Sequence, residues 1–225
     1  MKDATPGCWG VAFVLLGIQM NVIFVAYYTR DSLYSEYAQN LAQSLHQFDL
    51  TYRIVGINDQ GSWDKNTHYK PIFLRQMLDE LHPVSLVYVD VDALIHQMPI
   101  LFDDLVTDPT VDIAAHILDH KKFNHTIPPE LLSGTLYLAN TSNTRQIVDE
   151  WIQACKAFAK IWDQLALDQV LKARNYQGFR NLPEQYTTIY DYMKDVKDPV
   201  IVHYQASRLC RTQIRPTIKG IKSLR

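Results

Sequence analysis

The sequence predicts an α/β protein built on an open sheet with helices on its faces. Strand-length apolar runs alternate with segments whose apolar residues recur every three or four positions, which is the pattern of βαβα folds. The run at 84–90, VSLVYVD, is apolar almost throughout, as expected for a strand that helices cover on both sides. In an open α/β sheet the ligand site lies at the carboxyl ends of the strands.

The first half of the chain supplies three predicted strands and two predicted helices. The strands are expected at 21–29, 50–57 and 84–90. Apolar residues at intervals of four, from Leu33 to Leu45, predict an amphipathic helix between the first two strands. A polar loop at 58–69 is expected to lead into a second helix that begins at Lys70 and Pro71.

The second half continues the alternation. Strands are expected at 111–118, 134–140 and 200–203. A helix from about Thr144 carries an apolar stripe, and another is predicted at 163–173. No internal repeat or low-complexity linker interrupts the chain, so residues 20–225 are expected to form one domain.

Residues 1–19 are expected to be an N-terminal extension ahead of that domain. The apolar run Cys8–Ile18 is shorter than the roughly 20 residues that span a bilayer, and only Lys2 precedes it as a basic side chain. A weak membrane association through 8–28 is the alternative. The three cysteines form no CxxC pair, so neither a disulfide framework nor a zinc site is indicated, and a cytoplasmic location is expected.

The charge of the chain is unevenly distributed. The formal net charge is −2, but the 27 residues from Pro199 onward carry six Lys or Arg and no acid, which leaves −8 for residues 1–198. Such a basic C-terminal segment indicates either a phosphate-bearing or acidic partner or a solvated charged tail. Composition leaves both alternatives open.

Asp90 and Asp92 follow the buried run at 84–89 directly. If the strand persists through both residues, their carboxylates face the same side. Their repulsion would raise at least one pKa unless a cation lies between them, and paired carboxylates suit Mg²⁺ or Mn²⁺. The alternative is a pair of solvated aspartates in a turn.

The segment YVDVDALI, followed by PILFDDL, resembles the DxD segment of the GT-A glycosyltransferases. This resemblance implies a Rossmann-like nucleotide-diphospho-sugar transferase fold with a mixed, mostly parallel central sheet. It also implies that Asp92 binds a divalent cation, Mn²⁺ or Mg²⁺. Asp90 would contact either that metal or the ribose of a nucleotide-diphosphate sugar.

Two further blocks support the resemblance. ELLSGTLYLAN resembles the block that lines the donor-sugar and acceptor pocket in these enzymes, which implies substrate contacts for Ser133 and Gly134. LALDQVL resembles the D-Q element of the retaining, glycogenin-like members. On that resemblance Asp168 and Gln169 are the catalytic candidates that contact the transferred sugar or the acceptor.

The segment VIVHYQASR carries the last block. By resemblance His203 completes the metal site, and Arg208 and Arg211 would meet the donor where glycogenin-like enzymes have Gly and Lys near the phosphates. This departure makes the segment more similar to a less characterised group of nucleotide-diphospho-sugar transferases.

Three more residues are candidates for donor binding. Tyr28 and Thr29 end the first predicted strand, where GT-A enzymes hold the base, although core packing also explains an aromatic residue there. Lys70, at the expected start of a helix, would meet the diphosphate because helix N-termini favour anions. A solvated lysine is the alternative.

These motifs favour one function over several others. The sequence has no G-x-G-x-x-G after the first strand, no G-K-[ST] and no G-x-S-x-G, which argues against a dinucleotide oxidoreductase, a P-loop kinase and an α/β-hydrolase. The leading hypothesis is a metal-dependent, retaining glycosyltransferase that uses a UDP-sugar. Its hydroxyl acceptor is a glycan, a protein or a nucleic acid, and no obligate protein partner is indicated. A nucleotidyltransferase and a non-catalytic nucleotide-binding module are the alternatives.

Overall fold

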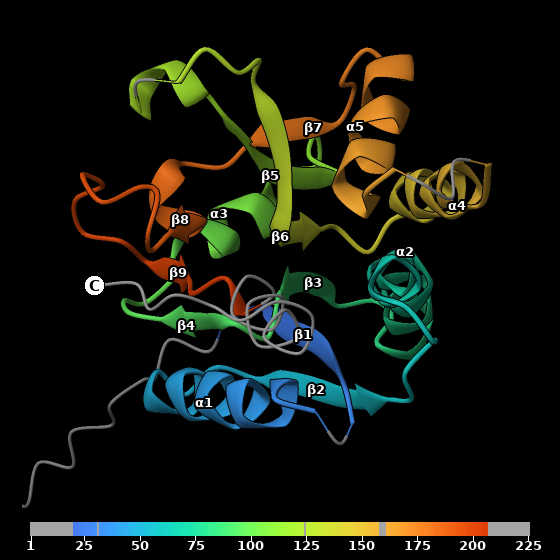
Figure 1. Ribbon diagram of the computed structural model, residues 1–225. Coiled ribbons are helices and arrows are strands. Elements are labelled where there is room, and N and C mark those ends of the chain that lie inside the picture. Colours follow the sequence, from blue (N-terminus) through green and yellow to red (C-terminus); the bar gives the residue numbers. More distant parts are fainter. Residues whose placement is uncertain (1–19, 31, 124, 158–160, 207–225) are drawn as a thin grey trace, which may run out of the picture.

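The computed structural model describes residues 20–30, 32–123, 125–157 and 161–206, and it is organised around a six-stranded sheet (Figure 1). The strand order is β2-β1-β3-β6-β5-β7. The strands are β1 (Val22–Thr29), β2 (Tyr52–Ile57), β3 (Ser85–Val89), β5 (Ile113–Leu118), β6 (Glu130–Leu138) and β7 (Phe179–Asn181). Of these six, β6 alone runs antiparallel to both neighbours. The predicted α/β class and the mixed, mostly parallel sheet are confirmed.

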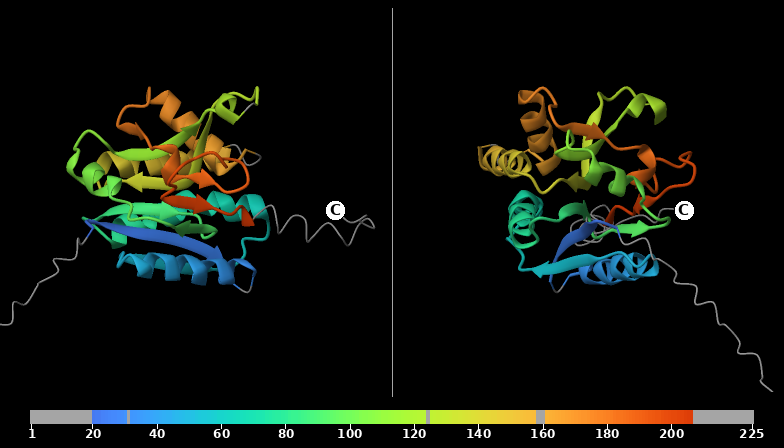
Figure 2. Two further views of the ribbon diagram at one scale, coloured as in Figure 1. Left: turned by 90° about the vertical axis from the view of Figure 1, so that its left-hand side faces the viewer. Right: turned by 180° about the vertical axis from the view of Figure 1, so that it is seen from behind.

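Helices cover both faces of this sheet (Figures 1 and 2). The helices are α1 (Tyr34–Gln47), α2 (Trp63–Glu80), α3 (Leu101–Thr107), α4 (Ser142–Ala157) and α5 (Asp163–Ala173). Alternate residues of β3 enter two separate cores: Val87 packs with α1 and α3, and Leu86 packs with α2, α4 and α5. Burial of β3 on both faces explains why the run at 84–90 is apolar almost throughout.

A second, three-stranded sheet lies beside the first. It contains β4 (Ala93–Ile95), β9 (Ile201–His203) and β8 (Thr188–Ile189), in the order β4-β9-β8. β4 comes directly after the turn that follows β3, and it pairs with β9 so that Ala93 lies opposite His203. This pairing brings His203 next to the carboxyl end of β3.

Three details of the predicted elements are wrong. Helix α2 begins at Trp63 rather than at Lys70, because Ser62 caps it by accepting a hydrogen bond from the Lys65 backbone N–H, and Pro71 lies inside the helix. β3 ends at Val89, so the strand does not persist through the two aspartates. The strand expected at 134–140 begins earlier, at Glu130.

The structure describes neither end of the chain. The N-terminal extension at 1–19 and the basic segment from residue 207 onward lie outside the described residues. Among the residues that the structure does describe, none of the helices combines the length and the apolar character needed to cross a bilayer.

Candidate active site

A cavity of about 500 Å³ opens at the carboxyl ends of β1 and β3. This is the edge of the sheet at which the sequence predicts the ligand site. Because β6 is antiparallel, its first residues reach the same edge, where the N-terminus of α5 and the end of β9 also arrive. The candidate residues that line the cavity are Tyr28, Thr29, Lys70, Asp90, Asp92, Ser133, Gly134 and His203.

Asp90, Asp92 and His203 converge within this cavity. Each offers one ligand atom, and these three atoms lie within 4.8 Å of one another. The two carboxylates meet because of the turn between β3 and β4, and not because they share one face of a strand. His203 is 3% exposed, and its Nδ1 lies 3.5 Å from Oδ1 of Asp92.

The surroundings of the three side chains hold them in place. Nε2 of His203 lies 2.8 Å from Oγ1 of Thr135, and this contact holds the imidazole ring with Nδ1 toward Asp92. The backbone N–H of Ala206 donates to Oδ2 of Asp92 over 2.9 Å. Two carboxylates and one imidazole are a donor set that Mn²⁺ or Mg²⁺ accepts, so the residues fit a divalent cation.

The two carboxylates differ in their electrostatic environment. Desolvation in the cavity raises the pKa of Asp90, the charge of Lys70 opposes this rise, and the neighbouring charge of Asp92 adds to it. Desolvation also acts on Asp92, but the hydrogen bond and charge of His203 outweigh it and lower the pKa of Asp92. Like charges in such proximity favour the presence of a cation.

Gly134 permits this close packing. A Cβ atom at position 134 would lie 3.0 Å from Cε1 of His203 and 3.3 Å from Oδ2 of Asp90. The carbonyl of Gly134 also accepts the backbone N–H of Asp90 over 2.8 Å. A larger residue would force His203 and Asp90 to shift by a few tenths of an ångström, because both side chains lie against the Gly134 backbone.

Lys70 occupies the centre of a second group of charges beside the first. Its Nζ lies 3.2 Å from Oδ1 of Asp90 and 3.0 Å from Oδ2 of Asp163, and it donates to Oγ of Ser133 over 3.0 Å. Burial opposes its charge, but Asp163 and Asp90 together raise the pKa of Lys70. Because Lys70 lies inside α2, the prediction that it acts from a helix N-terminus is wrong. It is a buried cation that fixes two carboxylates.

Comparisons with solved structures identify the architecture that carries these groups. A glycosyltransferase involved in the glycosylation of the major capsid of PBCV-1 matches with a TM-score of 0.67 at 11% identity, over 86% of this chain and 98% of that one. The glycosyltransferase GlyE of Streptococcus pneumoniae TIGR4 matches with a TM-score of 0.55 at 18% identity, over 83% of this chain and 55% of that one. The galactosyltransferase LgtC, solved with donor and acceptor sugar analogs, matches with a TM-score of 0.50 at 14% identity, over 89% and 98% of the two chains.

The chain has the GT-A glycosyltransferase fold. No protein-family model matches the sequence, and no curated protein matches it. The likeness therefore lies in the three-dimensional arrangement of the elements.

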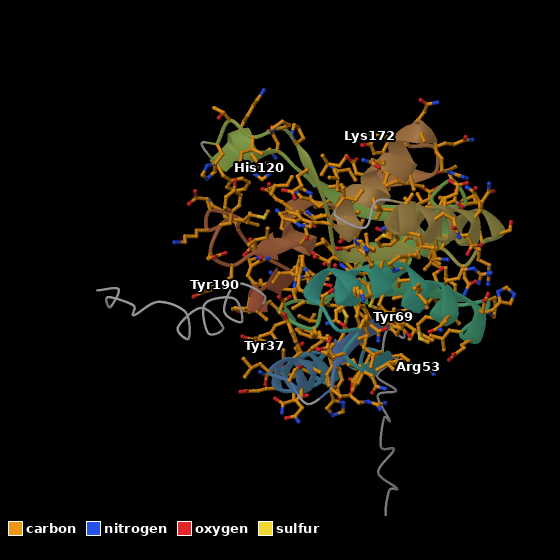
Figure 3. All side chains as sticks on the ribbon, turned by 45° about the vertical axis from the view of Figure 1, so that its right-hand side comes forward. Tyr37, Arg53, Tyr69, His120, Lys172 and Tyr190 are labelled. Carbon is orange, nitrogen blue, oxygen red and sulfur yellow. The ribbon has the colours of Figure 1, made fainter. Side chains whose placement is uncertain are left out.

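Within this GT-A fold, Asp168 and Gln169 do not reach the cavity. Asp168 is buried on α5, where it pairs with Lys172 and accepts the Tyr176 hydroxyl over 2.6 Å, while Gln169 is exposed. Lys172 lies on the outer part of α5 (Figure 3). Any role of this pair in catalysis stays a prediction from sequence.

A second D-Q pair, which sequence reasoning missed, does line the cavity. Asp163 and Gln164 form the first turn of α5. The carbonyl of Asp163 accepts the indole N–H of the fully buried Trp151 over 2.7 Å, and its carboxylate accepts the Ser133 hydroxyl over 2.8 Å. The GT-A fold thus presents a D-Q dipeptide to the cavity from the start of a helix.

The remaining donor candidates are partly described. Tyr28 and Thr29 lie at the end of β1 and are half-buried in the cavity wall, and their role in holding a base stays a prediction. Arg208 and Arg211 lie outside the described residues.

Proposed function

We propose that the protein is a metal-dependent glycosyltransferase that moves a sugar from a nucleotide-diphosphate sugar, with a UDP-sugar favoured, to a hydroxyl acceptor. The observation that carries this proposal is the convergence of Asp90, Asp92 and His203 in the cavity of a GT-A fold. Those three side chains would hold Mn²⁺ or Mg²⁺. Bound there, the cation would stabilise the negative charge that develops on the leaving nucleoside diphosphate.

The other residues of the cavity have supporting roles in this proposal. Tyr28 and Thr29 would hold the base at the end of β1. Lys70 would keep Asp90 and Asp163 ionised and fixed in position, since its Nζ contacts both. The late histidine and a D-Q pair in the cavity wall support retention of configuration at the transferred sugar.

A thermal-shift titration with UDP and UDP-sugars tests the donor assignment. We expect UDP to stabilise the protein only when Mn²⁺ is present, because the cavity has four carboxylates against one lysine among its described lining residues and would repel a bare diphosphate. A ligand at 100 times its Kd adds roughly 2.7 kcal/mol to the free energy of unfolding. Mn²⁺ alone and UDP with EDTA are the controls.

The products of the reaction distinguish the enzyme classes. Release of UDP from a UDP-sugar supports glycosyl transfer. Release of pyrophosphate from a nucleoside triphosphate and a sugar phosphate would instead show that the protein is a nucleotidyltransferase. A stabilisation by UDP that does not depend on Mn²⁺ would contradict the proposed role of the three converging side chains.

Replacement of Gly134 by Ala should weaken Mn²⁺ binding about tenfold, since changes to groups that orient metal ligands commonly cost this much or more. The added methyl group would press on His203 and Asp90 and displace their ligand atoms. Isothermal titration with Mn²⁺ measures the effect, and urea denaturation shows whether the fold is intact. An unchanged Kd for Mn²⁺ would contradict the expectation that the added methyl group displaces these ligand atoms.

A further inference from the structure

The cavity has a second polar end along β6. Glu130, Leu132, Ser133 and Gly134 all line the cavity from the first part of β6. Gly134 lies against the proposed metal ligands, and Glu130 is four residues away, which corresponds to about 13 Å of strand. Glu130 therefore marks the end of the cavity that is remote from the proposed metal site.

A chain of hydrogen bonds organises this remote end. Nε2 of His120 lies 3.1 Å from Oε2 of Glu130, and Nδ1 of His120 lies 2.8 Å from the hydroxyl of Tyr192. The amide of Gln164 donates to the other oxygen of Glu130. These side chains come from four segments of the chain: the turn after β5, the start of β6, the first turn of α5 and the loop after β8. His120 is 6% exposed and so forms the buried centre that orients Glu130 and Tyr192.

Apolar and aromatic surface surrounds the polar chain. Leu118, Leu132 and Ile189 are buried together beneath it and line the cavity. Trp162 lines the cavity as well, and it is 51% exposed. Fixed polar groups on an apolar and aromatic wall suit a ligand that has both hydroxyl groups and apolar C–H faces, as a sugar ring does.

The charges of the cavity disfavour an anionic ligand at this end. The described residues that line it include four carboxylates, Asp90, Asp92, Glu130 and Asp163. Lys70 is the one Lys or Arg among those described lining residues, and it is already paired with two of the carboxylates. A phosphate or uronate group beside Glu130 would meet a like charge and no free cation within the described lining.

We propose that Glu130, His120, Tyr192 and Gln164 form the acceptor subsite and that this subsite takes an uncharged carbohydrate. Glu130 and Tyr192 bind acceptor hydroxyl groups, and His120 positions both. The inference rests on the proposed glycosyltransferase function and deepens it, because it selects a neutral glycan over the nucleic acids and acidic glycans that the basic C-terminal segment left open.

Matched pairs of glycosides test the subsite without requiring turnover. The probes are the p-nitrophenyl β-glycosides of glucose and galactose and the corresponding glucuronide and galacturonide, which replace one hydroxymethyl group by a carboxylate. Their binding to the full chain is measured by saturation-transfer NMR titration, with and without UDP and Mn²⁺. We expect at least one neutral glycoside to bind about tenfold more tightly than its uronide, as expected for juxtaposed like charges.

Two variants assign this preference to the named side chains. Glu130→Gln keeps the shape and removes the charge, so it should reduce the neutral-to-uronide ratio to about threefold or less. Tyr192→Phe removes one hydroxyl group and should weaken the neutral glycoside about fivefold, the equivalent of one hydrogen bond. Tyr190→Phe is the control, because Tyr190 is 62% exposed and does not line the cavity.

The outcomes separate this inference from the proposed function. The inference is overturned if no neutral glycoside binds, if the uronides bind equally well, or if Glu130→Gln leaves the ratio unchanged. Displacement of the glycoside by an oligonucleotide would also overturn it. If glycosides bind as expected but UDP and Mn²⁺ do not stabilise the protein, the donor assignment fails and the carbohydrate site stands.

Discussion

Replacing Lys70 by Met is expected to lower the free energy of unfolding by about 3–5 kcal/mol, the usual cost of removing one partner of a buried ion pair. Asp163 carries most of this effect, because its side chain is 8% exposed and would be left with an uncompensated charge. Asp90 contributes less, since its side chain is 39% exposed and solvent screens its pair with Lys70. Urea denaturation at pH 7 measures the loss.

Two further variants make the Lys70 result specific. The double variant Lys70→Met with Asp163→Asn should recover part of the stability, because it removes the buried charge together with its partner. Arg53→Met is the matched control: Arg53 pairs with Glu80 at the surface, both are more than 40% exposed, and its loss should cost less than about 1 kcal/mol. A Lys70→Met protein as stable as this control would show that the charge cluster contributes little.

Replacing Asp92 by Asn is expected to reduce UDP release from a UDP-sugar about a hundredfold or more, comparable to the loss of one strong electrostatic contact in a transition state. Asparagine keeps the size of the side chain and can still accept the Ala206 N–H, but it removes the charge that faces His203. Steady-state assays over a range of Mn²⁺ concentrations measure the loss. We expect the Mn²⁺ requirement to rise at the same time.

The control for Asp92→Asn is Asp195→Asn, because Asp195 is exposed and does not line the cavity. That variant should retain full turnover. If Asp92→Asn also retained it, with an unchanged Mn²⁺ requirement, a mechanism based on the two aspartates would be ruled out.

The sheet could be predicted because its strands carry strong local signals. β1 and β3 are long apolar runs whose two faces are both buried, and this pattern does not depend on tertiary context. The start of α2 could not be predicted from local sequence signals. Its first turns are polar, and the capping residue Ser62 is followed at the third position by Lys65 instead of the Glu or Gln of a capping box.

The D-Q motif did not by itself indicate which of its two copies in α5 reaches the cavity. The dipeptide occurs twice in α5, at 163 and at 168, and five residues along a helix rotate a side chain by about 140°. One copy must therefore face away from the other. Asp163 lies in the first turn of α5, where a helix approaches the edge of the sheet. This position was the available signal that the first copy, and not the second, reaches the cavity.

The three converging residues were predictable and the remote polar end was not. Asp90, Asp92 and His203 each follow or end an apolar strand, which indicates their place at the edge of a sheet. His120 and Tyr192 lie in irregular segments after β5 and β8, and only the packing of these segments brings them together. No spacing of residues in the sequence indicates the contact between His120 and Tyr192.

The pairing of β4 with β9 also sets an order of events during translation. All six strands of the central sheet come from residues 22–181, so they leave the ribosome before His203 does. Because N-terminal parts of a chain fold first during synthesis, the sheet can assemble around a pair of aspartates that has no histidine. The full set of three ligands in the proposed metal site would then exist only after β9 docks, so binding of the cation would be a late step in the maturation of the protein.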